Sequence, residues 1–259
     1  MLSYQEIDKF NQDGYLILDN YASTDLCDAI VDEIRFTLSK ANIPVNHGLR
    51  LCDAWQNFRN IRSLATDQKG IMVLRQLFGG NPFPFQTLNF PVGTQQKLHS
   101  DTIHFDSDPS GYMAGIWVAL EDVDETNGPL TYCPGSHRLP YVTMKRIGLR
   151  NSSDDYPRYE DYIEQMINQS GLPQFKAVMK KGQAFVWHAR LIHGGSHQSD
   201  KSRTRYSQVT HYFFEGMKYT TPMKKLERNP PRINMDLPYS ELNTEYGVTV
   251  VSPFYLQTS

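Results

Sequence analysis

The stretch KLHSDTIHFD contains two His-x-Asp triplets, one with His99 and Asp101 and the other with His104 and Asp106. Side chains two residues apart on a β-strand point to the same face, so a histidine and a carboxylate at this spacing can bind one metal ion. Two imidazoles and one carboxylate with open coordination positions form the facial triad of non-haem Fe(II) oxygenases. Either triplet can supply the first pair, and the second histidine must come from another part of the chain.

The segment GQAFVWHARLIHGGS offers two candidates for that second histidine, His188 and His193. His188 lies within a predicted strand. His193 lies at its end and is followed by Gly194 and Gly195, where the backbone can turn tightly beside a metal. The chain has eight histidines, and a single histidine is more often structural than a ligand. The prediction therefore depends on the combination of residues.

A candidate anchor for a carboxylate follows the same segment. Arg205 lies twelve residues after His193, in TRYSQVTH, and on a strand Arg205 and Ser207 face the same side. A guanidinium donates two parallel charge-assisted hydrogen bonds to a carboxylate. An iron enzyme with a keto-acid co-substrate needs such an anchor near its metal, and the spacing is consistent with that chemistry.

The elements that must position these residues begin with helices. Ser3 and Glu6 form a capping box for a helix that ends near Gly14, and the short strand YLIL follows. Apolar residues at helical spacing predict three more helices before residue 82. They are marked by Leu26, Ile30, Ile34 and Leu38, by Ala54, Trp55, Phe58, Ile61 and Leu64, and by Ile71, Leu74, Leu77 and Phe78.

From Pro82 the pattern changes to short alternating segments punctuated by Gly, Pro and Asn: FQTLNF, MAGIWVALEDV, LTYCP, KAVMK, AFVWHA and RYSQVTHYFF. Helices followed by many short strands predict a mostly β fold, a sandwich or jelly roll with helices on one side. We expect one domain over residues 1–259, with a helical part at 1–81 and a jelly-roll core at about 82–215.

Two segments fall outside this core. A polar, charged insertion at 141–171 contains a predicted helix; insertions of this length are often lids over a site, and a solvated surface helix is an equal alternative. The Pro-rich segment NPPRINMDLPYSELNTEYGVTVVSPF near the C-terminus is predicted to wrap the barrel or line its mouth.

Composition excludes some partners. With 26 basic and 28 acidic residues, the charge gives no case for nucleic acid or an anionic membrane. The three cysteines are widely spaced, which favours reduced thiols over a disulfide framework or a zinc site. The N-terminus lacks an apolar signal core, and no apolar run is long enough to span a bilayer. We therefore expect a cytoplasmic protein.

Four segments resemble the phytanoyl-CoA dioxygenase family of Fe(II)- and 2-oxoglutarate-dependent oxygenases: HSDTIHF, GIWVALEDVDETNGPLTYCPGSHRLP, KKGQAFVWHARLIHGGS and TRYSQVTHYFF. They span roughly residues 83–214, and IDKFNQDGYLILDNYASTDL is similar to the family's N-terminal helix and strand. The resemblance implies a double-stranded β-helix, a jelly-roll or cupin-like barrel, with N-terminal helices packed on one side.

The resemblance also distinguishes the two triplets. In the family, the His-x-Asp pair precedes the tryptophan of the next strand by about the separation of His99 and Trp117. That separation is eighteen residues, whereas His104 is thirteen residues from Trp117. The resemblance therefore implies that His99, Asp101 and His193 are the iron ligands, and the second triplet is the less favoured alternative.

The co-substrate residues are carried over in the same way. Arg205 would bind the far carboxylate of 2-oxoglutarate, with Ser207 assisting. The family's arginine more often lies one residue closer to the distal histidine, so Arg203 is the competing candidate. Ordinary strand packing explains the remaining candidates for lining the co-substrate site at least as well: Gln86, Asn89 and Trp117.

The resemblance implies a dioxygenase that uses Fe(II), 2-oxoglutarate and O₂, oxidises an unactivated C–H bond and releases succinate and CO₂. Related enzymes that replace the metal carboxylate by Gly or Ala bind chloride there and act as halogenases, so the presence of Asp101 favours hydroxylation. The expected partner is a small-molecule substrate, a metabolite or biosynthetic intermediate, because the chain has no evident basic cluster for the phosphates of coenzyme A. The sequence makes no prediction of the oligomeric state.

Three other functions fit parts of the sequence. A cupin-like isomerase or lyase would normally have two adjacent histidines and a glutamate in its first motif, which this chain lacks. A non-catalytic jelly-roll binding protein would have a degenerate site, whereas the predicted triad and arginine are intact. A zinc hydrolase can use the same ligands, but no Glu or His is evidently placed as its base.

Overall fold

The structure is a computed structural model that describes residues 1–259 except 46–47, 225, 228–231, 234–248 and 252–259. His47 and most of the Pro-rich C-terminal segment lie outside the described residues, and so does the expectation that this segment wraps the barrel. Among the described residues, no helix is both long enough and apolar enough to cross a membrane.

The predicted N-terminal helices are confirmed, except that the one marked by Ala54 to Leu64 is divided into a 3₁₀ turn, Ala54–Gln56, and an α-helix, Arg59–Ala65. The capping box at Ser3 and Glu6 is present, and the first helix ends at Gly14, whose φ of 81° is in the left-handed region that favours glycine. Ser23 caps the second helix by accepting a hydrogen bond from the backbone N–H of Leu26. These helices are α1 (Tyr4–Asp13), α2 (Thr24–Lys40), α3 (Arg59–Ala65) and α4 (Gln68–Phe78).

A seven-stranded antiparallel sheet forms the base of the site, with the strand order β1-β8-β5-β10-β3-β2-β13. Its strands are β1 (Tyr15–Leu18), β2 (Arg50–Cys52), β3 (Pro82–Phe90), β5 (Met113–Ala119), β8 (Ala184–His188), β10 (Ser207–Phe214) and β13 (Thr249–Val251). The three central strands β5, β10 and β3 bury residues on both faces, which explains the apolar run of β5. β3 and β10 also bury polar side chains on these faces.

Two three-stranded sheets complete the strand framework of the described residues, with the orders β7-β6-β9 and β12-β11-β4. Their strands are β4 (Asp106–Asp108), β6 (Leu130–Tyr132), β7 (Phe175–Ala177), β9 (His193–Gly195), β11 (Lys218–Thr221) and β12 (Leu226–Glu227). The short 3₁₀ helices are η1 (Ala54–Gln56), η2 (Asp101–Ile103), η3 (Ser136–Arg138), η4 (Lys145–Ile147) and η5 (Pro222–Lys224).

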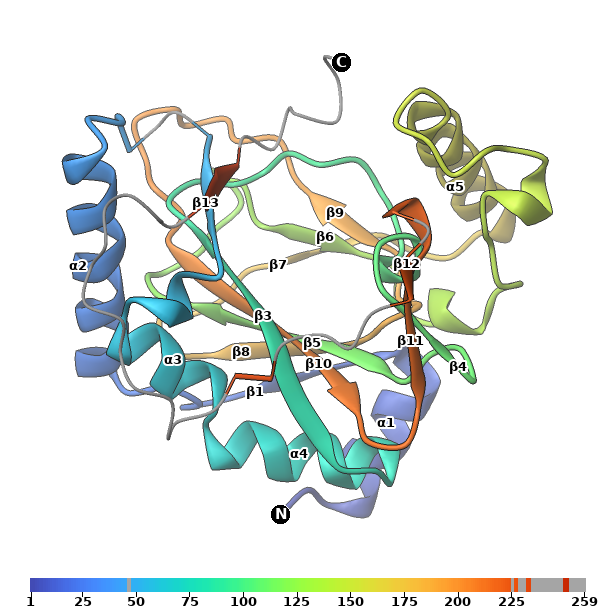
Figure 1. The fold of residues 1–259 in the computed structure, drawn as a ribbon, viewed down its shortest axis with the longest axis horizontal. Helices are drawn as coiled ribbons and strands as arrows, with labels where there is room; N and C mark the ends of the chain where they lie inside the picture. Colours follow the sequence, from blue (N-terminus) through green and yellow to red (C-terminus); the bar gives the residue numbers. More distant parts are fainter. Residues whose placement is uncertain (46–47, 225, 228–231, 234–248, 252–259) are drawn as a thin grey trace.

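The molecule has the layers of a jelly roll flanked by helices, as the sequence predicts. Figure 1 shows α2, α3 and α4 on one side of the strands and α5 (Tyr156–Ser170) on the opposite side of the view. One core cluster joins the N-terminal helices to the outer face of the large sheet. A second cluster, which includes Trp117 and Trp187, fills the space between the large sheet and β6-β7.

The insertion at 141–171 is anchored to the segments that carry the candidate ligands. Tyr159, Ile163 and Ile167 of α5 are buried in one cluster with Ile192, the residue before His193. The hydroxyl of Tyr159 accepts a hydrogen bond of 3.3 Å from the backbone N–H of Ser100. The predicted helix is therefore confirmed, and it forms a wall packed behind the His-x-Asp segment.

Candidate functional site

His99 and His193 face each other across an isolated antiparallel bridge. The N–H of His99 donates to the carbonyl of His193 at 2.9 Å, and the N–H of His193 donates back at 3.0 Å. Their rings therefore lie close together, with centroids 4.6 Å apart. The two-residue spacing predicts that Asp101 continues a strand from His99, and this prediction is wrong. Asp101 opens η2, and the side chain of Ser100 caps this turn by accepting from the N–H of Thr102.

The triad residues are brought together with their ligand atoms available. One side-chain atom from each of His99, Asp101 and His193 lies within 4.8 Å of the others, and all three residues are buried. Nδ1 of His99 lies 2.9 Å from the carbonyl of Lys97, and Nδ1 of His193 lies 3.0 Å from that of Leu191. A carbonyl only accepts, so each Nδ1 carries the proton and each Nε2 presents a lone pair.

The two carboxylate oxygens of Asp101 have different surroundings. Oδ1 lies 3.8 Å from Nε2 of His99 and 3.6 Å from Nε2 of His193. Oδ2 accepts a hydrogen bond of 2.7 Å from Nε1 of Trp187. It also lies 3.8 Å from Nε2 of His211. Oδ1 therefore faces the two imidazoles, and Oδ2 faces the large sheet.

The protonation states suit a divalent cation. Burial lowers the pKa of His99 to about 3, and the neighbouring His193 adds to the effect. Burial alone would raise the pKa of Asp101, but the nearby histidines and the Trp187 N–H together hold it below its ordinary value. At neutral pH the site thus offers a neutral imidazole from His99 and an ionised carboxylate, the forms in which these groups bind metals.

The second His-x-Asp triplet has other partners. Nε2 of His104 lies 3.2 Å from the hydroxyl of Tyr156 on α5. Asp106 accepts hydrogen bonds from the backbone N–H of Ser107 at 2.8 Å and from the hydroxyl of Ser110 at 2.9 Å. Its other oxygen accepts from the hydroxyl of Tyr141. Both residues are thus engaged outside the triad.

Arg205 is a buried cation two residues before β10 of the large sheet. Its side chain donates a 2.6 Å hydrogen bond from Nη1 to the hydroxyl of Ser207. Its guanidinium lies over the rings of Trp117 and Phe90, at 5.4 and 5.8 Å from their centroids. Burial lowers its pKa to about 10. Its Nε is buried and has no hydrogen-bond partner, so this N–H is available to an anionic ligand.

Arg203, the competing anchor, lies in a different environment. Its Nη1 donates to Asp124 at 2.9 Å, and its side chain is 38% exposed. The geometry therefore gives Arg205 a buried guanidinium with an unpaired Nε and leaves Arg203 in a surface ion pair.

Two of the three weaker candidates lie on the face of Arg205. Trp117 is stacked against the guanidinium, and Oε1 of Gln86 lies 3.0 Å from Nδ1 of His211. Asn89 is not brought to the site. It donates to Oε1 of Gln208 at 3.0 Å, and Gln208 in turn donates to the backbone of α3. The period of two along β3 puts Asn89 on the helix-facing side.

Three residues near the triad were missed by sequence reasoning. His211 follows Arg205 and Ser207 in the same alternation along β10, so the period of two could have identified it. Trp187 reaches Asp101 from β8 of the large sheet, which nothing in the sequence signals. Arg50 on β2 has a buried Nε without a hydrogen-bond partner, and its charge adds to the burial that lowers the pKa of His211 to about 4.

The glycines after the distal histidine have a different role from the expected one. A Cβ on Gly194 would lie 2.7 Å from the carbonyl oxygen of Gln96, and one on Gly195 would lie 2.6 Å from the backbone N of Gln95. Both contacts are too short. These glycines therefore let β9 approach the segment before His99 closely, rather than make a turn.

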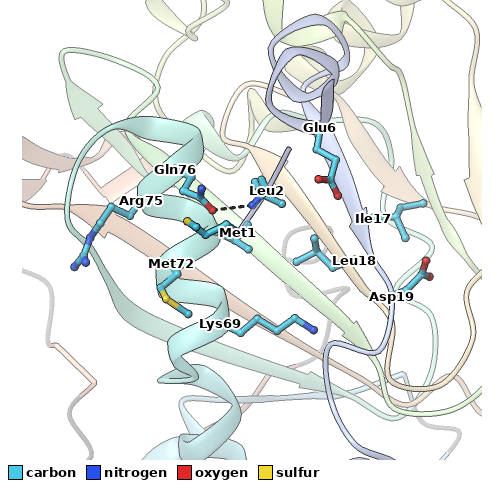
Figure 2. A pocket seen from close by; sticks show the side chains of 11 residues that line it. Met1, Leu2, Glu6, Ile17, Leu18, Asp19, Lys69, Met72, Arg75 and Gln76 are labelled. Atoms are coloured by element: carbon cyan, nitrogen blue, oxygen red, sulfur yellow. Dashed lines mark hydrogen bonds between the residues drawn. The ribbon is translucent and has the colours of Figure 1, made fainter. Parts of the chain in front are cut away.

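A cavity of about 510 Å³ lies away from the triad, beside α1, the end of β1 and α4. Figure 2 shows its lining, including the hydrogen bond of 3.0 Å from the N–H of Leu2 to Gln76. None of the candidate site residues line it. We therefore assign it no part in the chemistry of the triad.

Comparisons with known proteins agree with this geometry. Residues 10–205 match the family model described as phytanoyl-CoA dioxygenase. The chain is 25% identical over 266 residues to the peroxisomal phytanoyl-CoA dioxygenase of Rattus norvegicus, covering 90% of this chain and 74% of that protein.

Solved structures share the fold. The α-ketoglutarate-dependent carbocyclase SnoK from nogalamycin biosynthesis aligns with a TM-score of 0.70 and 17% identity, over 90% of this chain and 95% of that one. EctD from S. alaskensis with 2-oxoglutarate and 5-hydroxyectoine aligns with a TM-score of 0.68 and 18% identity, over 88% and 84%.

Proposed function

The chain belongs to the phytanoyl-CoA dioxygenase family of Fe(II)- and 2-oxoglutarate-dependent oxygenases, and we propose that it hydroxylates an unactivated C–H bond of a small metabolite or biosynthetic intermediate. His99, Asp101 and His193 are the proposed iron ligands. Arg205 and Ser207 are the proposed anchor for the far carboxylate of 2-oxoglutarate. Gln86 and Trp117 are proposed to line the co-substrate site.

One observation carries the proposal. Two buried histidines, each with Nδ1 held by a backbone carbonyl, direct Nε2 toward the same oxygen of Asp101. Three protein ligands on one side of a metal leave positions open for a co-substrate and O₂. The buried guanidinium of Arg205 lies two residues before β10 of the large sheet, and its Nε has no hydrogen-bond partner. It matches the charge and planar shape of a carboxylate.

When bound, Fe(II) and 2-oxoglutarate would supply the activation of O₂ that hydroxylates the C–H bond, one oxygen atom entering the substrate and the other the succinate that forms with CO₂. The protein's own part is to bind, orient and exclude water. Arg205 donates to the far carboxylate and fixes the direction from which the keto acid reaches the triad. Trp117 shields the guanidinium on its ring face, so that the pairing is made away from water, where it is stronger.

The surroundings of the triad favour a largely apolar substrate segment beside the metal. Phe85 stacks on His211 and lies edge-on to Phe105, with ring centroids 6.0 and 5.2 Å apart. Aromatic walls exclude water and pack against hydrocarbon. Arg50 adds a second positive charge near His211, and this charge suits an anionic group of the co-substrate or substrate.

We further propose that residues 1–259 act as one catalytic domain in the cytoplasm. The N-terminal helices share a core with the outer face of the sheet that carries Arg205, which supports a single unit. In this proposal, the helix of the insertion at 141–171 acts as a fixed wall of the site because its apolar face is buried.

The test is an Fe(II) titration of the purified chain coupled to succinate release, with 2-oxoglutarate and a panel of metabolites. We expect saturable Fe(II) binding and succinate release that rises with a true substrate and requires both Fe(II) and O₂. Fe(II) binding without 2-oxoglutarate turnover for any substrate would instead favour the non-catalytic binding protein. Turnover of substrate without succinate would favour the isomerase or lyase.

A further inference from the structure

Four residues form a row across the large sheet beneath Asp101. Trp187 on β8 is the register partner of Gly115 on β5, Gly115 is the partner of His211 on β10, and His211 is the partner of Gln86 on β3. Directly opposed residues in neighbouring strands place their side chains on the same face of the sheet. The row therefore presents an indole, a gap and an imidazole toward the triad.

The gap at Gly115 admits the indole of Trp187. A Cβ at Gly115 would lie 2.2 Å from Cζ2 and 2.3 Å from Cε2 of Trp187, distances at which two carbon atoms cannot coexist. The indole thus lies across Gly115 and reaches toward the centre of the sheet. There its ring is 6.3 Å from that of His211, at an interplanar angle of 82°.

The indole N–H of Trp187 forms a hydrogen bond with the carboxylate of Asp101. Trp187 is 2% exposed, and its Nε1 donates to Oδ2 of Asp101 at 2.7 Å, a short, charge-assisted bond. Oδ2 is thereby turned toward the sheet, and Oδ1 alone is left facing Nε2 of His99 and His193. A carboxylate with both oxygens free could instead bind a metal through both of them.

We propose that Trp187, admitted by Gly115, is a positioning residue that holds Asp101 as a single-oxygen metal ligand and so keeps the remaining coordination positions open. This inference rests on the proposed function, because it takes Asp101 as a ligand. In this proposal Trp187 acts through the carboxylate of Asp101.

The experiment replaces Trp187 in the full-length chain by benzothienylalanine, which keeps the shape of the indole but has sulfur in place of N–H. Trp187→Phe is the genetically encoded counterpart. Both are titrated with Co(II) as a stand-in for iron, and the visible absorption of bound Co(II), whose intensity falls as the coordination number rises, is recorded. We expect metal affinity about 10- to 100-fold weaker, the range for lost outer-shell partners, and a weaker, shifted Co(II) absorption.

The matched control is Trp55→Phe. Nε1 of Trp55 also donates to an aspartate, Oδ1 of Asp53, at 3.1 Å, but Asp53 is not among the triad residues. We expect this control to keep the metal affinity and the Co(II) spectrum of the wild type. Gly115→Ala should reproduce the loss, because its methyl group takes the space of the indole.

Three outcomes would overturn the inference. One is wild-type affinity and spectrum in the benzothienylalanine protein, and another is an equal loss in Trp55→Phe. A loss in Gly115→Ala alone would mean that crowding, and not the N–H, is responsible. If the wild-type chain itself binds no Co(II) or Fe(II), the proposed function fails together with the inference.

Discussion

Replacing Arg205 by methionine should weaken the binding of 2-oxoglutarate without lowering the stability of the free protein. Two charge-assisted hydrogen bonds to the far carboxylate of 2-oxoglutarate are worth about 1.5–3 kcal/mol each, so their loss should weaken 2-oxoglutarate binding by about 10²- to 10⁴-fold. The free protein should not be weakened in the same way. Burial lowers the pKa of the Arg205 guanidinium to about 10, against 12.5 for an ordinary arginine, so keeping this charge buried costs about 3 kcal/mol of folding free energy.

Methionine keeps most of the volume of the arginine side chain and removes its charge. We therefore expect the free Arg205→Met protein to unfold at the same temperature as the wild type or at a higher one. The dissociation constant for 2-oxoglutarate is measured by calorimetry under anaerobic conditions in the presence of metal, and the unfolding temperature by scanning calorimetry without either ligand.

The matched control is Arg203→Met, two residues away on the chain. Arg203 pairs with Asp124 at the surface, an interaction of about 0–1 kcal/mol. Because this pair is not part of the proposed anchor, 2-oxoglutarate binding should stay within about threefold of the wild type, well below the loss expected for Arg205. The reasoning is refuted if Arg205→Met binds 2-oxoglutarate as the wild type does, or if Arg203→Met is the more damaged variant.

Two further predictions concern histidines. His99→Ala should abolish Fe(II) binding, while His104→Ala, which loses a hydrogen bond with a tyrosine hydroxyl, should leave metal affinity largely intact; a metal titration that gives the opposite order would move the site to the second triplet. His188→Gln should make the protein less sensitive to acid. Burial lowers the pKa of His188 to about 3, below its value of about 6.5 in the unfolded chain, so the unfolded state binds the proton first and stability falls as the pH drops below 6.5. This slope is about 1.4 kcal/mol per pH unit, so between pH 7 and pH 5 the wild type should lose up to about 2 kcal/mol more than the variant; equal losses in denaturant titrations at the two pH values would contradict the assignment.

The sequence determined the elements wherever a local pattern has a direct physical meaning. The capping box at Ser3 and Glu6, the left-handed cap at Gly14 and the alternating strand segments all correspond to observed elements. The two caps depend on contacts between residues close together in the chain, so the residue types alone specify them. The strand segments are recognised by their alternation, although their hydrogen bonds join remote parts of the chain.

The sequence also predicted the triad and the arginine, but through family resemblance and not through spacing alone. On spacing, His104 was as good a partner as His99, and the family's usual gap after the distal histidine left Arg203 in competition with Arg205. The structure separates these pairs by their surroundings: His104 contacts a tyrosine of α5, and Arg203 lies in a surface ion pair. Such partners come from distant segments, so no local pattern could have distinguished them.

Tertiary structure alone decided what surrounds Asp101. The indole that binds its second oxygen comes from β8, the gap that admits this indole is Gly115 on β5, and both depend on strand register. The exclusion of Asn89 from the site has the same cause, since one step along β3 turns a side chain from the barrel interior to the helices. The chain's sequence fixes which groups are present, and the pairing of remote strands fixes which of them meet.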